Sequence, residues 1–205
     1  MKIKIYIEGG GEKNSSLKSE LRKGFSQFFE KAGLQGRLPQ SIACGSRKEA
    51  FNRFRTALKN AKSNELPILL VDSEEPVTTK AWQHVKNRQG DHWDKPSTAA
   101  EDHLHLMVQC MESWFMADRE TLANYFGQGF DSNALPRNQN IENIPKYDLF
   151  NKLKSATKNT TKGQYNKGSH SFKILERLDP SKVRKASPHA KRLLKLLDEK
   201  LAQNL

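Results

Sequence analysis

Hydrophobic and polar residues alternate at the start of the chain and then change to a helical spacing. Isoleucines at 3, 5 and 7 alternate with Lys4 and Tyr6, which is the two-residue period of a β-strand. Glycines at 9–11 predict a tight turn, because glycine has no Cβ to obstruct it. Apolar residues at 17, 21, 25 and 28 then follow the period of an amphipathic helix. The opening of the chain therefore predicts a strand, a turn and a helix that ends near Gly33.

Strand and helix patterns continue to alternate as far as about residue 130. Further strands are predicted at 41–44, 66–72 and 103–110, with helical stretches at 46–61, 82–96 and 111–127. The run at 66–72 is apolar on both faces, which is typical of a central parallel strand. Right-handed crossovers then give an α/β fold with a Rossmann-like parallel four-stranded sheet. In a flavodoxin-like order the second and third strands flank the first.

The pattern changes in the last third of the chain, where no further strand is predicted. A helix is expected at about 145–157, a glycine-containing basic loop at 158–170, and helix starts at Asp179 and Ser187. The final helix carries a leucine stripe, which indicates core packing or, alternatively, a dimer or partner face. We therefore predict an α/β domain over residues 1–130 and a basic helical extension over 131–205, packed on that domain.

The distribution of charge adds a candidate partner to this picture. The formal net charge is +12, and residues 146–200 hold 15 Lys and Arg against five Asp and Glu. Nearly all of the excess positive charge thus lies in the last quarter of the sequence, which favours a polyanion such as nucleic acid. A solvated basic tail is the alternative.

Other compositional features bear on the compartment. No apolar run approaches the roughly 20 residues that a membrane span needs, and the N-terminus lacks a signal-peptide core. The two cysteines, Cys44 and Cys110, match no metal-binding spacing, and a low cysteine content is typical of a reducing compartment. We therefore expect a cytoplasmic protein with no membrane contact.

Acidic residues follow two of the predicted strands. Glu8 and Glu12 flank the glycine turn, whose sequence fits neither a dinucleotide-binding fingerprint nor a P-loop. Asp72 and Glu74 follow the central strand, and the carboxyl ends of parallel strands meet at one edge of a sheet. Several carboxylates at one edge need a cation to remain ionised, and Mg²⁺ or Mn²⁺ would suit them. Ordinary acid-rich turns are the alternative.

Basic and histidine side chains form a second group of candidates. Ser46 and Arg47 begin the helix that follows the second strand, where they could hold a phosphate or simply cap the helix. Three lysines in the basic region could neutralise a nucleic-acid backbone, namely Lys162, Lys167 and Lys173. His103 and His105 share a strand face, but without a convincing third ligand they are interpreted as edge or interface histidines.

Three of these motifs together resemble a Toprim (topoisomerase–primase) domain. They are the Glu8–Glu12 turn after the first strand, Asp72-Ser73-Glu74 after the third, and Glu112-Ser113-Trp114-Phe115 after the fourth. The likeness to Toprim domains covers about residues 1–126. A closer likeness is to a group of small bacterial proteins akin to RloB-like proteins and the Toprim domains of OLD-family nucleases. It extends over most of the chain and includes residues 44–47 and the region of residues 162–163.

The resemblance implies roles for individual acids. Glu8 matches the glutamate that acts as general acid or base, and Glu12 matches the second acid of the OLD-type turn. Asp72 and Glu74 match the magnesium-binding pair, although Glu74 stands where aspartate is usual. Glu112 matches, more loosely, an acid after the fourth strand. Glu8 and Glu12 are therefore the catalytic candidates, and Glu8, Asp72, Glu74 and Glu112 are the candidate metal ligands.

These features lead to one principal hypothesis and two alternatives. The principal hypothesis is a Mg²⁺-dependent nuclease that cleaves phosphodiester bonds of DNA or RNA. The resemblance implies work beside a separate ATPase subunit in bacterial phage defence. The alternatives are a non-catalytic module that binds nucleic acid or a protein partner, and a phosphate-ester enzyme for a small nucleotide. A homo-oligomer is left open.

Overall fold

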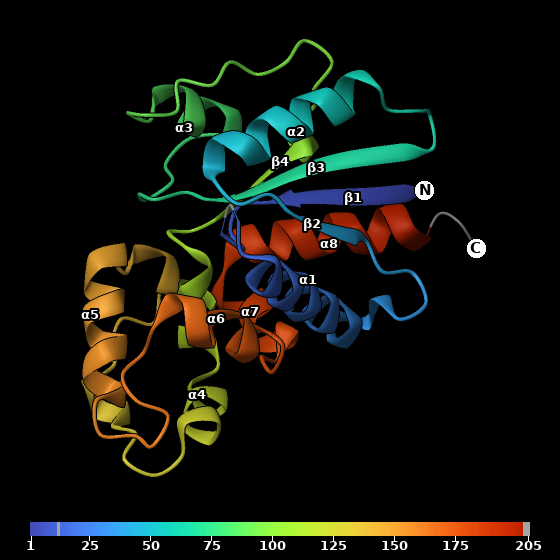
Figure 1. The fold of residues 1–205 in the computed structure, drawn as a ribbon. Helices are drawn as coiled ribbons and strands as arrows, with labels where there is room; N and C mark the ends of the chain where they lie inside the picture. Colours follow the sequence, from blue (N-terminus) through green and yellow to red (C-terminus); the bar gives the residue numbers. More distant parts are fainter. Residues whose placement is uncertain (12, 203–205) are drawn as a thin grey trace.

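The computed structural model describes residues 1–11 and 13–202, and these form a sheet covered by helices on both faces (Figure 1). The strands are β1 (Lys2–Ile7), β2 (Gln40–Ala43), β3 (Glu65–Asp72) and β4 (Leu104–Met107). The α-helices are α1 (Ser15–Phe29), α2 (Arg47–Lys59), α3 (Ala81–Asn87), α4 (Arg119–Phe126), α5 (Lys146–Thr157), α6 (Lys167–Leu175), α7 (Pro180–Ala186) and α8 (Pro188–Ala202). A π-helical turn, η1 (Glu30–Leu34), extends α1, and short 3₁₀ segments are η2 (Glu101–His103), η3 (Met111–Ala117), η4 (Ser132–Ala134) and η5 (Ile141–Asn143).

The strands pair in parallel in the order β2-β1-β3-β4. This confirms both the parallel four-stranded sheet and the predicted flanking of β1 by β2 and β3. Ile5 lies opposite Ser41 on one side and Ile68 on the other, so β1 and β3 are the two central strands. The predicted fourth strand at 103–110 is too long, because pairing with β3 ends at Met107. β3 itself ends at Asp72, the residue paired with Met107, so residues 108–110 have no strand to pair with.

Hydrophobic residues fill both faces of the sheet in two clusters. Ile5 and Ile7 face the first cluster, which contains the phenylalanines of α1, whereas Tyr6 faces the second cluster beneath α2 and α3. The alternation read from the sequence of β1 thus separates the two helical layers seen in Figure 1. β3 contributes to both clusters through alternate side chains, Leu70 to the first and Leu69 to the second. This confirms that β3 is buried on both faces.

The C-terminal helices pack into the first cluster. The leucines of α8 are buried there, so the predicted core packing of this stripe is confirmed. The same cluster contains side chains from both sides of residue 130, and the boundary between residues 1–130 and 131–205 stays a prediction. The predicted loop at 158–170 is wrong in its last part, because α6 already begins at Lys167. The Asn166 side chain accepts a hydrogen bond from the Gly168 N–H and thereby caps this helix.

Two further features match the composition of the chain. Cys44 and Cys110 are buried and free, and they belong to clusters on opposite faces of the sheet. Within the described residues, no helix is both long enough and apolar enough to span a bilayer.

α1 and α6 approach each other closely at Gly24. A Cβ built on Gly24 would lie 2.9 Å from the main-chain oxygen of Phe172, and a backbone atom cannot move aside as a flexible side chain can. Gly24 therefore sets the distance at which α6, and the residues it carries, lie against the sheet domain.

We expect Gly24→Ala to destabilise the protein. Overpacking costs about 1–3 kcal/mol, which exceeds the roughly 1 kcal/mol that alanine gains over glycine inside a helix. Urea unfolding followed by circular dichroism measures the loss. Ser19→Ala, at an exposed position of the same helix, is the matched control and should be neutral or slightly stabilising. Equal stability of the two variants would contradict the close packing of α6.

Candidate active site

Four carboxylates gather where the strands end at their carboxyl edge. Glu8 follows β1, Asp72 ends β3, Glu74 lies two residues further, and Glu112 lies in η3 after β4. We call these four residues the acid centre. Asp72 is 4% exposed and Glu112 is fully buried, so the charges of these two side chains need partners within the protein.

Two lysine ammonium groups lie among these carboxylates. Lys146 Nζ is 2.7 Å from both carboxylate oxygens of Glu74 and 3.3 Å from Asp72 Oδ2. Lys167 Nζ lies 3.6 Å from Asp72 Oδ2 and 3.7 Å from Glu112 Oε1. Repulsion among the acids was expected to require a bound cation, but in the structure the protein itself supplies two positive charges.

Both lysines are the first residues of their helices, α5 and α6. A positive side chain at a helix N-terminus is electrostatically unfavourable, because the helix dipole is positive there. The attraction of the neighbouring carboxylates is stronger than this unfavourable effect of the helix dipole. Burial alone would lower the pKa of Lys167, but the negative charges of Glu112 and Asp72 raise it above its usual value. Asp72 and Glu74 likewise raise the pKa of Lys146 against the effect of burial.

Glu112 is held by two hydroxyl groups from the segment around α6. Tyr165 Oη donates to Glu112 Oε1 at 3.1 Å, and Ser171 Oγ donates to the same oxygen at 3.0 Å. Burial and the nearby Glu112 charge raise the pKa of Tyr165 well above its ordinary value, so the phenol keeps its proton. The second oxygen, Glu112 Oε2, is buried and has no hydrogen-bond partner. A buried carboxylate oxygen without a partner is uncommon and leaves one ligand position open.

Arg47 connects Glu8 to a second acid. Its guanidinium donates to Glu8 Oε2 at 3.1 Å and to both oxygens of Asp91 at 2.7 and 2.8 Å, and it also donates to the main-chain oxygen of Asp72. The guanidinium lies 5.0 Å from the ring centre of Trp93, which limits its movement. Burial raises the pKa of Glu8, Asp72 raises it further, and Arg47 opposes both effects.

The backbone at Glu74 is held in an uncommon conformation. Its φ is 68°, in the left-handed region that residues other than glycine rarely adopt. The Glu74 N–H donates to the Gln109 main-chain oxygen at 2.8 Å, and the Gln109 side chain accepts from the Lys146 N–H at 3.2 Å. Gln109 therefore aligns Glu74 with Lys146. Such conformations cluster at functional sites, where the surrounding structure holds them in place.

One of three comparisons with known proteins found a match, and it extends over nearly the whole chain. A family model described as a domain of unknown function, DUF4276, matches residues 7–198. The chain belongs to the DUF4276 family. Searches of curated proteins and of solved structures gave no significant match.

Not all predicted site residues of this DUF4276 chain belong to the acid centre. Ser46 is the N-cap of α2 and accepts from the Glu49 N–H at 3.3 Å. Lys162 lies 5.5 Å from the ring centre of Tyr125, and Lys173 pairs with Glu20 at 4.0 Å. Glu12 lies outside the described residues.

Only one of the two candidate histidines lies on β4. The ring of His105 is buried with neither nitrogen hydrogen-bonded, and burial together with Arg192 lowers its pKa to about 3. His103 ends η2, before the strand begins, and accepts a hydrogen bond from the Ala100 N–H at 2.9 Å. The predicted shared strand face is therefore wrong, and neither histidine belongs to a metal-binding group among the described residues.

All four residues of the acid centre were predicted, but several residues around it were missed and one was given a different role. Lys146, Tyr165, Ser171 and Asp91 were not singled out, and Lys167 was assigned to a nucleic-acid backbone. Lys146 and Lys167 could have been found from their position at the start of a helix. A positive charge is unfavourable there, so a lysine at that position indicates a nearby negative partner. Tyr165 and Ser171 gave no comparable signal, since their importance comes from contact with a residue far away in the sequence.

The donor set of the acid centre suits a hard divalent cation in its chemistry. Carboxylate oxygens are the ligands that Mg²⁺ prefers, and Glu112 Oε2 has no other partner. Among the residues that the structure describes, no three His, Cys, Asp or Glu side chains already form a metal-binding group. The ammonium groups of Lys146 and Lys167 lie between the acids, so a cation would have to exchange places with them.

We expect Lys146→Met to destabilise the protein in metal-free buffer. The change leaves Asp72 and Glu74 without their nearest positive charge and should cost about 1–3 kcal/mol. Chemical unfolding at pH 7 in the presence of a chelator measures this cost. Lys154→Met, at an exposed position of the same helix, should stay within about 0.5 kcal/mol of the wild type. Similar losses in both variants would show that Lys146 is not needed to balance the acids.

Proposed function

We propose that this protein is a Toprim-like, Mg²⁺-dependent nuclease that hydrolyses phosphodiester bonds in DNA or RNA. The observation that carries the proposal is the acid centre at the carboxyl edge of a parallel sheet, where α/β proteins bind their ligands. Asp72, Glu74 and Glu112 would hold Mg²⁺ or Mn²⁺. The bound ion would supply Lewis-acid activation of the phosphate and of the attacking water.

Glu8 is the proposed general acid or base. Its raised pKa brings its proton exchange closer to neutral pH, as such a role requires. Arg47 positions the carboxylate through one oxygen, Oε2, and leaves the other oxygen available for proton transfer. Glu12, the second catalytic candidate from the resemblance, keeps that role as a proposal.

Lys146 and Lys167 would bind the phosphate group of the substrate. Both ammonium groups lie at the acid centre, and a divalent cation that takes the carboxylates would leave these groups free to pair with phosphate oxygens. A lysine can change partners from a carboxylate to a phosphate more easily than an arginine can. Its ammonium group is a compact charge on a flexible side chain, whereas the arginine guanidinium is planar and rigid.

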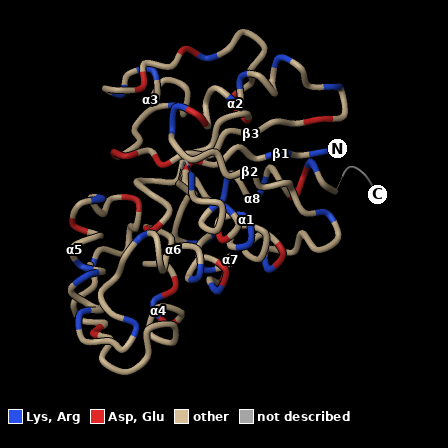
Figure 2. Tube along the Cα trace, in the orientation of Figure 1, with Lys and Arg blue, Asp and Glu red and all other residues tan. Residues whose placement is uncertain are grey.

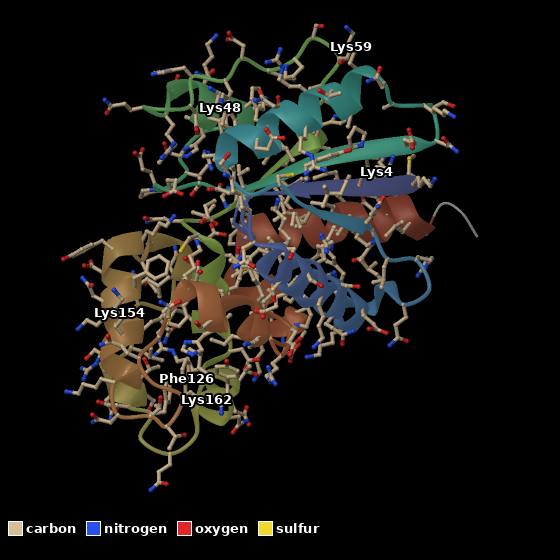
Figure 3. The ribbon with its side chains drawn as sticks, in the orientation of Figure 1. Lys4, Lys48, Lys59, Phe126, Lys154 and Lys162 are labelled. Atoms are coloured by element: carbon tan, nitrogen blue, oxygen red, sulfur yellow. The ribbon has the colours of Figure 1, made fainter. Side chains whose placement is uncertain are left out.

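Lysines away from the acid centre would bind more distant parts of the nucleic acid. In Figure 3, Lys154 and Lys162 extend outward from α5 and the loop that follows it, whereas Lys48 and Lys59 extend from α2 on the opposite side of the sheet. Lysine and arginine are in fact spread over both sides of the protein, as Figure 2 shows. Only those that share a side with the acid centre would follow the same strand of nucleic acid.

We expect Asp72→Asn to abolish cleavage and metal binding while keeping the fold. Asparagine retains an acceptor for the Met111 N–H, now 2.9 Å from Asp72 Oδ1, but removes the negative charge. A ligand at 100 times its Kd stabilises the folded state by about 2.7 kcal/mol. Differential scanning calorimetry with and without Mn²⁺ should therefore show a rise in Tm for the wild type and little change for Asp72→Asn.

Asp94→Asn is the matched control for this experiment. Asp94 is exposed and, among the described residues, pairs only with the exposed Lys86, so this variant should keep both the Tm shift and the cleavage. An equal metal response of wild type and Asp72→Asn would remove the acid centre as the metal site. The protein would then be a non-catalytic binding module.

We expect Lys162→Ala to weaken nucleic-acid binding equally for all sequences. Removal of one phosphate contact should reduce the slope of log affinity against log salt by about one. Fluorescence anisotropy over a range of salt concentrations measures both quantities. Lys59→Ala, on the opposite side of the sheet, is the control and should leave affinity and slope unchanged. Identical slopes for wild type and Lys162→Ala would place Lys162 on a solvated face.

The wider biological setting is also proposed on resemblance. A separate ATPase subunit, a role in bacterial phage defence and a cytoplasmic location follow from the Toprim-like motifs and the composition. Lys167, first interpreted as a contact to the nucleic-acid backbone, keeps phosphate as its proposed ligand but at the acid centre itself. Lys173 and Ser46 are weaker candidates, because each already has a protein partner.

A further inference from the structure

Tyr147 is the most exposed large hydrophobic side chain in the part of the chain that the structure describes. Its relative exposure is 77%, against 37% for Met1 and 39% for Leu38. Single exposed apolar side chains are common on protein surfaces, so exposure alone does not indicate a function for Tyr147. Its location relative to the acid centre is the relevant observation. An aromatic ring that no neighbour covers can stack on another ring without any rearrangement of the protein.

Tyr147 lies at the margin of the acid centre. It is the second residue of α5 and directly follows Lys146, whose ammonium group contacts Asp72 and Glu74. Consecutive Cα atoms are about 3.8 Å apart, so the Tyr147 side chain begins next to that of Lys146, the residue proposed to bind the phosphate. Successive side chains of a helix point about 100° apart, so the exposed ring lies to one side of the Lys146 side chain, where it would meet a base of the nucleotide next to the bound phosphate.

The exposed face of α5 continues from Tyr147 as a polar and basic ridge. Tyr147, Asn151, Lys154 and Lys158 are all exposed and follow one another at spacings of three and four residues, which places them on one face of the helix. With a rise of about 1.5 Å per residue, this ridge extends about 16 Å from the acid centre. Its two lysines can pair with successive phosphates of a nucleic-acid backbone.

We infer that Tyr147 stacks on an unpaired base beside the phosphate at the acid centre, so that the substrate is single-stranded nucleic acid. The inference rests on the proposed nuclease function and adds the substrate class. Bases within a duplex are stacked on each other and offer no free face, whereas an unpaired base stacks readily on an aromatic side chain. The basic ridge and the adjacent acid centre favour nucleic acid over a protein partner as the occupant of this surface.

Binding without cleavage tests the inference. Affinities are measured with Ca²⁺ in place of Mg²⁺, because Ca²⁺ also binds carboxylate oxygens and can therefore free Lys146 and Lys167 for phosphate. Three probes are compared: a short single-stranded DNA, the same DNA as a duplex, and an abasic strand with the same phosphates. Wild type should prefer the single strand over the abasic strand by on the order of tenfold, as expected for one stacked base. Tyr147→Ala should lose this preference and bind both strands equally, while Tyr147→Phe should retain it.

A spectroscopic variant gives a second measurement. The three native tryptophans are buried, so Tyr147→Trp introduces an exposed indole whose fluorescence a stacked base should quench. Leu38→Ala, which removes an exposed apolar side chain just before β2, is the control and should bind as wild type.

The outcomes separate the inference from the proposed function. If wild type binds and cleaves nucleic acid but Tyr147→Ala keeps its preference for bases over the abasic strand, the inference alone is overturned. Tyr147 would then belong to an interface with a protein. If wild type binds none of the probes and cleaves no nucleic acid, the proposed function and the inference both fall.

Discussion

A balance of charge between the acid centre and the ammonium groups of Lys146 and Lys167 connects the carboxyl edge of the sheet to α5 and α6. Asp72 and Glu112 are buried at the strand ends, where unpaired negative charge would be strongly unfavourable. The ammonium groups of Lys146 and Lys167 offset this negative charge at N–O distances of 2.7–3.7 Å. Each lysine is the first residue of its helix, where the helix dipole disfavours a positive charge. The acids and the two helix starts therefore stabilise each other, and neither arrangement is favourable alone.

This balance makes the C-terminal helices part of the site. Tyr165, Lys167 and Ser171 all reach Glu112 from the segment that begins α6, and Gly24 lets that helix lie close to α1. Lys146 likewise connects α5 to Asp72 and Glu74, and its backbone N–H donates to the side chain of Gln109. A metal ion or a phosphate that competes for these charges would act on the helices as well as on the acids. Ligand binding and the docking of α5 and α6 are thus coupled in the proposed function.

Local pattern was sufficient to predict the sheet but not the limits of every element. The alternation in β1 and the apolar run of β3 predicted buried strands, and right-handed crossovers predicted a parallel sheet. The flavodoxin-like order considered for that sheet is the one that the structure has. The fourth strand was predicted too long because Val108 and Cys110 are apolar although they follow the last paired residue: Val108 packs in the second cluster and Cys110 in the first, beside η3. The start of α6 was missed because a segment with glycine and lysine shows no helical period of its own.

Strand period and the handedness of the crossovers were enough to place Glu8, Asp72 and Glu74 at one edge of the sheet, whereas Glu112 became a candidate only through the resemblance to Toprim domains. The positive charges that balance these acids come from the packing of distant segments. Lys146 lies 74 residues from Asp72 in the chain, and Lys167 lies 55 residues from Glu112. No local pattern encodes such pairings, since they arise when helices dock on the sheet and burial leaves each charge to find a partner.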